Sequence, residues 1–468
     1  MDRETDVLIV GSGPAGVISA YTAAKMGRSV LLADAKTYEE IGNKTCGDAV
    51  DLKAPTFLKD NIGIELPHGD EVSDIVEYLV IQTQKHEFPI QGDGFVVDRH
   101  IYGQRLLKMA ESAGAEILPN RKALKGLFEG DQVVGASFKN TETKQDENIK
   151  AKITIDCSGR NYIIRKTMPE GKFPKLEHTH GPHEIVASFR EIIKLKEDHP
   201  YHKKIYLMYD KRVPEPGYFW FFSKGEKMLN AGIGWKLSME GKGSNMRKIY
   251  KDVLHKYYPE GSYEVVDGAG YTIPTRYPLL NQVGNGFMTA GDAAFHVDPF
   301  TAEGHGPALM AGYLAGKYAS DAIEANDLSE KQLWGYNKAT FDAFGIQHCK
   351  TQLLTEALQA IRIKGMDFIL GRKIMTTNEF GDLNRGIKPS MLSILNKAIR
   401  VTPKFNYLFK LKKLADGTTK VDQLFDEYPT SPDGYNEWYE RFYPWFNKAI
   451  LSYGNYPGLK NMAESSGN

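Results

Sequence analysis

A glycine-rich motif near the amino terminus restricts the fold of this 468-residue chain more than any other feature. The hexapeptide Gly11-Ser12-Gly13-Pro14-Ala15-Gly16 has the spacing G-x-G-x-x-G. An apolar run precedes it at residues 7–10, small residues of helical character follow at 17–26, and a second apolar run occupies 30–33. This context predicts strand, tight turn, helix and strand, which is a βαβ unit of the dinucleotide-binding kind.

Each glycine of the motif has its own expected role. Gly11 permits the tight turn, Gly13 lets a diphosphate approach the backbone, and Gly16 lets the helix pack on the strand. Asp34 ends the second apolar run, where an acid can bind both ribose hydroxyls of an adenosine. The alternative is an ordinary βαβ turn that binds no nucleotide. The residues expected to contact the nucleotide here are Gly11, Gly13, Pro14, Ala15, Gly16, Asp34 and Ala35.

A second element favours FAD over NAD. Gly291-Asp292 follows an apolar run at 287–290, and Gly304 and Gly306 open a predicted helix. This arrangement resembles the second FAD motif of the flavoprotein group that includes aromatic hydroxylases and geranylgeranyl reductases. The resemblance implies that Asp292 binds the ribityl chain and that the helix amino terminus faces the pyrimidine edge of the flavin.

Further segments resemble other parts of that group. Asp156-Cys157-Ser158-Gly159 resembles its third element, which makes Gly159 a cofactor residue. Asp98-Arg99, with Arg105, resembles the arginine near the flavin or its diphosphate, although Asp98 also fits a helix N-cap. His296 and His305 flank the second motif, where each is either a proton relay or a structural histidine.

Lys44-Thr45-Cys46-Gly47 resembles the K-x-C-G segment of geranylgeranyl reductases. There the cysteine lies over the flavin face, so the resemblance makes Cys46 the candidate catalytic group and Lys44, Cys46 and Gly47 cofactor contacts. A cysteine is a soft donor with a tunable pKa, as a hydride-transfer site requires. The alternative is that Cys46 is a small buried hydrophobic side chain.

The run Tyr218-Phe219-Trp220-Phe221-Phe222 resembles an aromatic strand of the same family. Tyr218, Trp220 and Phe222 alternate, so they share one strand face and can line a site for a long apolar chain. The chain departs from the family pattern, since Glu215 and Ser223 stand where prolines are expected. Core packing is the alternative, because Phe219 and Phe221 make the other face apolar too.

The combined resemblance is to archaeal-type geranylgeranyl reductases (digeranylgeranylglycerophospholipid reductases). It implies an α/β and α+β protein with a Rossmann-like FAD-binding domain, an inserted antiparallel-sheet substrate domain and a mostly helical carboxy-terminal region. The expected FAD-binding domain is discontinuous, over 1–65, 96–165 and 274–330. The substrate-binding domain is expected at 66–95 and 166–273, and the helical domain at 331–468.

The resemblance also implies an activity. Reduced FAD would pass hydride from N5 to an isoprenoid double bond in a membrane ether lipid, with Cys46 as proton donor or positioner. The electron donor is expected to be NAD(P)H or ferredoxin. Two alternatives stay open: a flavin-dependent monooxygenase or halogenase, for which Lys44 would be the lysine near the flavin, and a non-enzymatic prenyl carrier, which would be colourless.

Composition narrows the possible partners. The 59 basic and 59 acidic residues balance, which gives no reason to expect nucleic-acid binding. Three sparse cysteines fit a reducing cytoplasm and show no metal-ligand spacing, so no metal site is expected. No secretory signal or bilayer-length apolar run is seen, and a lipid substrate would then require transient contact with the membrane surface. Residues 409–414 and the aromatics of 438–446 suit such contact or helix packing.

Overall fold

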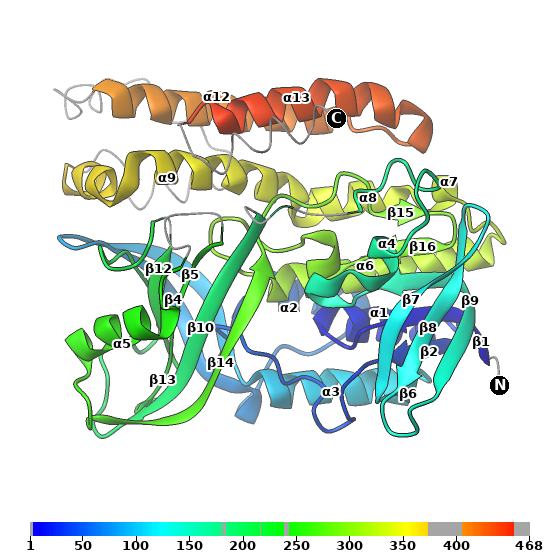
Figure 1. Cartoon of the computed structure of the whole chain (residues 1–468), viewed down its shortest axis with the longest axis horizontal. Helices are drawn as coiled ribbons and strands as arrows, with labels where there is room; N and C mark the ends of the chain where they lie inside the picture. Colours follow the sequence, from blue (N-terminus) through cyan, green and yellow to red (C-terminus); the bar gives the residue numbers. More distant parts are fainter. Residues whose placement is uncertain are drawn as a thin grey trace.

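The computed structural model describes residues 3–178, 181, 184–215, 217–237, 243–372 and 405–453, which form two large sheets under a layer of helices (Figure 1). The predicted combination of α/β and α+β architecture is confirmed. The carboxy-terminal range predicted as helical also includes 373–404 and 454–468, which lie outside the described residues.

The first sheet contains the glycine motif. Its strands run in the order β15 (Val283–Gly284), β16 (Phe287–Thr289), β9 (Asp146–Asp156), β1 (Arg3–Val10), β2 (Val30–Ala33) and β6 (Glu116–Leu118). Every pair from β16 to β6 is parallel, while β7 (Arg121–Glu129) and β8 (Gln132–Asn140) extend from β9 as an antiparallel meander. Residues 7–10 of β1 are buried, as expected of a strand covered on both faces.

Two helices pack closely against this sheet and each other. α1 (Pro14–Lys25) begins with Pro14 in its first turn, three residues earlier than predicted, and α6 (His305–Glu324) lies against it. A Cβ on Gly312 would lie 2.5 Å from the Ala15 carbonyl oxygen, and one on Gly316 would lie 2.6 Å from that of Ser19. These glycines therefore set the helix separation, which places the start of α6 beside the glycine motif.

The second sheet is wide and almost entirely antiparallel. Its order is β14 (Tyr263–Pro274), β10 (Ile185–Leu195), β13 (Met228–Lys236), β12 (Tyr218–Ser223), β11 (Lys204–Met208), β4 (Val72–Gln82), β5 (Glu87–Val97) and β3 (Ala49–Asp51). The exception to antiparallel pairing is β11 with β4. β3 falls in the range predicted for the FAD-binding domain but pairs with β5. The domain boundaries themselves stay a prediction.

The two faces of β12 have different partners, as the alternation predicts. Phe219 and Phe221 pack with Tyr250 and Leu254 of α5 (Met246–Tyr257) in the core on one side of the sheet. Tyr218, Trp220 and Phe222 point to the opposite side.

The remaining helices join or cover the sheets. Figure 1 shows α9 (Ile346–Gly371) above the second sheet, with α12 (Phe405–Asp426) and α13 (Tyr435–Leu451) in a second row beyond it. α2 (Lys53–Ile62) follows β3, and α3 (Arg99–Ser112) has Asp98 as its N-cap, accepting from the backbone N–H groups of His100 and Ile101 as predicted. Short helices are α4 (Ile163–Lys166), α7 (Glu330–Leu333) and α8 (Gly335–Thr340).

The aromatic residues of α13 form core contacts. Trp438, Phe442 and Phe446 are at most 1% exposed, and Phe425 of α12 packs on the first two. The possibility that these three side chains contact a membrane is therefore wrong, because the core covers them. Phe409 of α12 differs, since it is 71% exposed.

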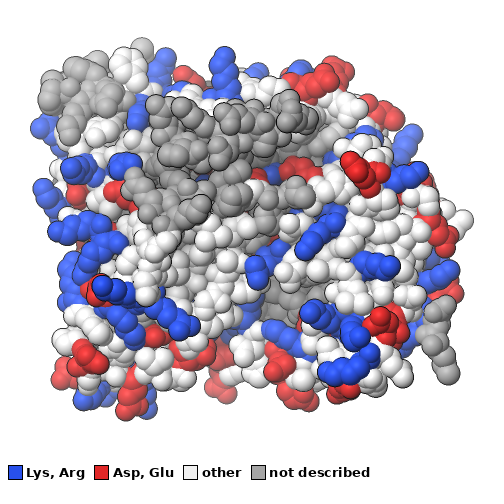
Figure 2. Space-filling view, in the orientation of Figure 1, with Lys and Arg blue, Asp and Glu red and all other residues white. Residues whose placement is uncertain are grey.

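The surface carries mixed charge. Figure 2 shows Lys and Arg interspersed with Asp and Glu over the described part of one face. No helix among the described residues is long and apolar enough to cross a membrane.

Candidate active site

The glycine loop leaves room for a ligand at one position. Gly11 has a φ of +103°, and a Cβ on it would lie 2.4 Å from the Cys157 carbonyl oxygen. A Cβ on Gly16 would lie 1.8 Å from the Gly11 oxygen, so the chain itself requires both glycines. A Cβ on Gly13 meets nothing within 4 Å. The open space at Gly13 lies at the start of α1, where no side chain caps the first N–H groups, and these features fit a diphosphate.

Asp34 lies beside this loop. Its Oδ2 accepts hydrogen bonds from the backbone N–H of Ser12 at 2.7 Å and from the Ser12 hydroxyl at 2.6 Å. Its Oδ1 accepts from the backbone N–H of Lys36 at 2.9 Å, and the neighbouring Ala35 is exposed. These bonds hold the carboxylate at the carboxyl end of β2, the position expected for a group that binds ribose.

The second glycine motif abuts the first. Gly291 has a φ of +69°, and a Cβ on it would lie 3.2 Å from Cβ of Ala15. Lys44 Nζ lies 2.9 Å from Oδ2 of Asp292, although 248 residues separate the two in sequence. Burial lowers the pKa of Lys44, but the Asp292 carboxylate and Tyr271 outweigh it, so the net pKa is raised. Lys44 is therefore a cation, and it ties the K-x-C-G segment to the second motif.

Four hydrogen bonds fix the loop around Cys46. Arg99 Nη1 and the backbone N–H of Asp48 each donate to Cys46 Sγ at 3.2 Å. Asn230 Nδ2 donates to the Cys46 carbonyl oxygen at 2.7 Å and to Asp48 Oδ2 at 3.0 Å. The sulfur therefore accepts from the protein, which leaves any S–H proton free to point elsewhere. The other arginine at this helix, Arg105, pairs with Glu71 instead.

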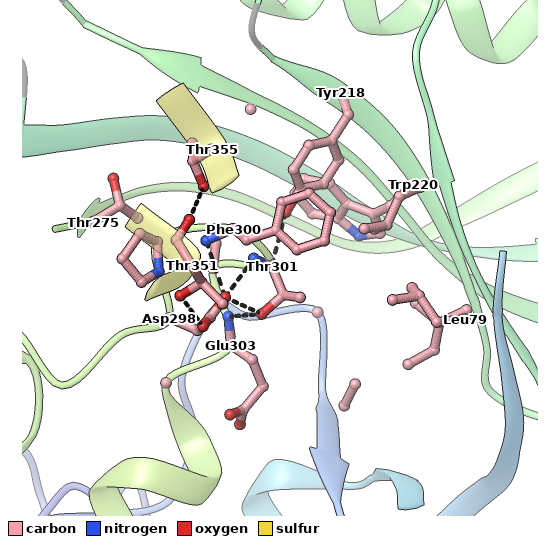
Figure 3. Close-up of a pocket in the computed structure, with 18 of the residues that line it drawn as sticks. Leu79, Tyr218, Trp220, Thr275, Asp298, Phe300, Thr301, Glu303, Thr351 and Thr355 are labelled. Atoms are coloured by element: carbon pink, nitrogen blue, oxygen red, sulfur yellow. Dashed lines mark hydrogen bonds between the residues drawn. The ribbon is translucent and has the colours of Figure 1, made fainter. Parts of the chain in front are cut away.

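A cavity of about 630 Å³ opens beside this loop (Figure 3). Tyr218, Trp220 and Phe222 all line it. The Tyr218 hydroxyl donates to the Thr301 carbonyl oxygen at 2.9 Å, and Trp220 Nε1 donates to Asn230 Oδ1 at 3.0 Å. The wall thus contacts the Cys46 loop through Asn230.

Two glycines fit against these aromatic rings. A Cβ on Gly47 would lie 2.4 Å from the Phe222 ring, and one on Gly232 would lie 2.1 Å from the Trp220 indole. Gly47 is thus required by contact with the cavity wall, a role that the sequence resemblance did not suggest.

The opposite wall is helical and polar, a feature that was not predicted from the sequence. Figure 3 shows Thr351 and Thr355 of α9 across the cavity from Tyr218 and Trp220. The sequence did contain a signal for this wall. Polar residues recur three and four positions apart along α9, and residues at that spacing share one helix face. The polar and charged lining residues of α9 are Gln347, His348, Thr351, Thr355, Gln359 and Arg362.

The loop before α6 brings carboxylates into the cavity. Asp298 accepts from the backbone N–H groups of Phe300 and Thr301 and, at 2.7 Å, from the Thr351 hydroxyl. Glu303 Oε1 accepts from the backbone N–H of Gly306 at 2.7 Å, so it occupies part of the α6 amino terminus. Burial, with Asp51 next in weight, raises the pKa of Glu303 to about 8. None of the three acids Asp51, Asp298 and Glu303 was among the site residues predicted from the sequence.

The predicted residues at the start of α6 are tightly surrounded. A Cβ on Gly304 would lie 2.8 Å from Val297, and one on Gly306 would lie 3.0 Å from Ala54. Gly159, with a φ of +67°, follows β9 and lies near Tyr271, the ring beside Lys44.

The two flanking histidines are buried. His296 Nε2 lies 2.8 Å from Gln282 Oε1, and its Nδ1 accepts from the backbone N–H of Gly291. Burial lowers the pKa of both His296 and His305 well below the ordinary value. His296 therefore supports the second motif as a neutral group, which matches the structural alternative.

These features define an FAD-dependent oxidoreductase, and FAD is its cofactor. Residues 6–167 match the family model described as FAD dependent oxidoreductase, and residues 185–271 match the one described as geranylgeranyl reductase catalytic domain. The chain is 31% identical to a digeranylgeranylglycerophospholipid reductase from Sulfolobus acidocaldarius, over 92% of this chain and 95% of the relative. The chain belongs to the geranylgeranyl reductase family.

Solved structures share the fold. A crystal structure from Thermoplasma acidophilum, described as geranylgeranyl bacteriochlorophyll reductase-like, matches with a TM-score of 0.72 at 21% identity, over 89% of this chain and 100% of that chain. A flavin-dependent brominase matches with a TM-score of 0.65 at 18% identity, over 87% of this chain and 100% of that chain. The halogenase alternative thus shares the architecture, while the sequence relationship is to the reductases.

Proposed function

We propose that this enzyme hydrogenates the carbon–carbon double bonds of geranylgeranyl chains in archaeal-type ether phospholipids or their precursors. The observation that carries the proposal is the cavity, whose aromatic wall leads to Cys46 beside the two flavin motifs. The name of the Sulfolobus acidocaldarius relative agrees with such a substrate.

The residues of this chain have separate proposed tasks. The glycine loop and Asp34 bind the adenosine diphosphate half of FAD, and Asp292, held by Lys44, binds its ribityl chain. Tyr218, Trp220 and Phe222 orient the apolar chain and exclude water. Bound FAD supplies hydride once it is reduced. Cys46 acts closest to that event, as proton donor or as positioner. The remaining predicted contacts are Arg99, Gly159, Gly304 and Gly306.

We also propose a transient contact with the membrane surface and an external electron donor, NAD(P)H or ferredoxin. The proposed substrate is a membrane lipid, and Phe409 on α12 is an exposed aromatic next to Lys412, whose side chain is 76% exposed. An apolar ring beside basic side chains suits a lipid interface.

Anaerobic flavin reoxidation tests the proposal. The holoenzyme is reduced with dithionite, freed of excess reductant and mixed with a geranylgeranyl ether phospholipid. Return of the oxidised-flavin absorbance with the unsaturated lipid, and none with its saturated counterpart, supports the proposal. Reoxidation that requires oxygen would favour a monooxygenase or halogenase, and a colourless protein that takes up no flavin would indicate a carrier.

A further inference from the structure

Glu303 contributes a carboxyl group to the wall of the cavity. Its Oε1 accepts the backbone N–H of Gly306, and Figure 3 shows its carboxyl group pointing away from the hydrogen bonds of Asp298. No ion pair to Glu303 is present among the residues that the structure describes. A carboxylate with no counter-ion in such a place is costly, so the neutral acid is favoured.

Other acids add to this effect. A Cβ on Gly306 would lie 3.2 Å from Asp51 Oδ1 and 3.5 Å from Glu303 Oε1, so the two carboxyl groups approach the same glycine. Asp298, which lies in the same loop as Glu303, is a third acidic group near this position. Groups of like charge that share a site cannot all ionise readily.

The surrounding titratable groups do not cancel the acids. His305 of α6 and His348 of α9 both line the cavity, and burial lowers the pKa of His305 well below its ordinary value and that of His348 to about 4. Both rings are therefore neutral near pH 7. Among the described residues, three cations line the cavity, and each has a partner other than Glu303. Lys53 Nζ donates to the Ala343 carbonyl oxygen at 2.7 Å, Lys236 pairs with Glu356 at 3.3 Å, and Arg362 pairs with Glu215 at 3.9 Å.

We propose that Glu303 gives the proton to the alkene in this cavity, which leaves Cys46 as a positioning residue. The inference rests on the proposed function. One alkene carbon would take a hydride from the reduced cofactor, which would thereby be oxidised by two electrons. The O–H bond of Glu303 breaks as a C–H bond forms at the other carbon, and the π bond is lost. The lipid gains H2, and the Glu303 carboxylate takes a new proton from water.

The geometry agrees with this role. Oε1 is already used by the Gly306 N–H, so the carboxylic proton is expected on Oε2. Cys46 accepts hydrogen bonds at its sulfur from Arg99 and Asp48, which suits a group that holds the loop in place. An unactivated alkene has no carbonyl to polarise it, so the site requires a placed proton source.

The test uses Glu303→Gln, in which the amide oxygen can keep the bond from Gly306 but no carboxylic proton remains. Single-turnover reoxidation of the reduced holoenzyme by a geranylgeranyl phospholipid is followed across pH 6 to 10, a range of about two units either side of the Glu303 pKa. The wild-type rate should fall as pH rises through about 8. The rate of Glu303→Gln should be about 10²-fold or more below the wild-type rate, and it should no longer depend on pH in this range. Glu303→Asp should recover part of the rate.

Infrared difference spectroscopy gives a readout independent of turnover. The wild type, without lipid, should show a protonated carboxylic C=O band that titrates near pH 8, and Glu303→Gln should lack it. Asp51→Asn removes a neighbouring acid, so it should move that midpoint to lower pH. Glu264→Gln on β14 changes an exposed acid and serves as the control, with no effect on rate or band.

The outcomes separate the two claims. A wild type that reduces no prenyl chain overturns the proposed function. An active wild type whose Glu303→Gln variant keeps the same rate and pH profile overturns the proton-donor role alone. Absence of the protonated band at pH 7 in the wild type also overturns it.

Discussion

Arg99 Nη1 donates a hydrogen bond to Cys46 Sγ at 3.2 Å, which links the start of α3 to the loop beside the cavity. Sequence resemblance suggested both residues, but it gave no reason for them to touch. Because Arg99 is buried, its contact with the sulfur orients Cys46 within a loop that Asn230 also holds.

The first prediction concerns this pair. Cys46→Ala and Arg99→Met should each lower turnover on a prenyl lipid, on the order of 10²-fold, since misplaced reacting groups cost about that much. If Arg99 acts through Cys46, the double variant should lose no more turnover than the less active of the two single variants. Steady-state kinetics measures the losses, and flavin absorbance checks that FAD stays bound to Cys46→Ala. Losses that simply add would contradict the coupling.

The second prediction separates two glycines of one motif. Gly13→Ala should fold normally but bind FAD about tenfold more weakly or worse, because its new Cβ points into the space expected for the diphosphate. Gly16→Ala should fail to fold stably, because its Cβ would lie 1.8 Å from the Gly11 oxygen. Thermal unfolding of the apoproteins and flavin titration measure both effects. Equal effects of the two substitutions on stability would contradict this reading.

The third prediction concerns chain length. Leu79→Trp adds bulk to the cavity wall, so it should impair reduction of geranylgeranyl chains more than of shorter prenyl chains. Ile75→Trp adds the same bulk on β4 at an exposed position outside this lining. Comparison of kcat/KM for long and short substrates provides the readout. A uniform loss with both substrates, or an equal loss in Ile75→Trp, would show that the cavity does not hold the chain.

The fourth prediction is a dependence of stability on pH. The pKa of Glu303 is raised from 4.5 to about 8 in the folded protein. Between these values the unfolded chain releases a proton that the folded protein keeps, so the free energy of unfolding falls as pH rises. Glu303→Gln should remove this decrease in the free energy of unfolding, because glutamine does not titrate. The variant should therefore gain stability over the wild type from pH 5 to pH 8, by on the order of 3 kcal/mol.

Thermal unfolding of the apoproteins at both pH values measures this gain, with Glu264→Gln as the control. A difference between variant and wild type that is the same at pH 5 and pH 8 would mean that Glu303 has an ordinary pKa.

Local patterns in the sequence predicted the elements that carry them. The glycine spacing predicted β1, α1 and β2, because each glycine role depends on neighbours within a few residues. The alternation of Tyr218, Trp220 and Phe222 likewise predicted a shared face, since side chains alternate along a strand. The resemblance placed Lys44 and Asp292 among the cofactor residues without predicting their contact.

Contacts between distant segments could not be predicted from local sequence patterns. The parallel pairing of β11 with β4 and the addition of β3 to the second sheet depend on how separate segments meet. Glu303 was missed for a similar reason. It stands directly before Gly304 in the sequence, but its raised pKa results from burial and from the nearby Asp51. Both arise only when the chain folds.

Mass spectrometry of a geranylgeranyl ether phospholipid, after anaerobic incubation with the holoenzyme and dithionite, tests the proposed hydrogenation most directly. We expect a stepwise gain of one H2 per double bond, which requires FAD and fails in Gly13→Ala without added flavin. An unchanged lipid mass, with FAD bound and fully reduced, would contradict it.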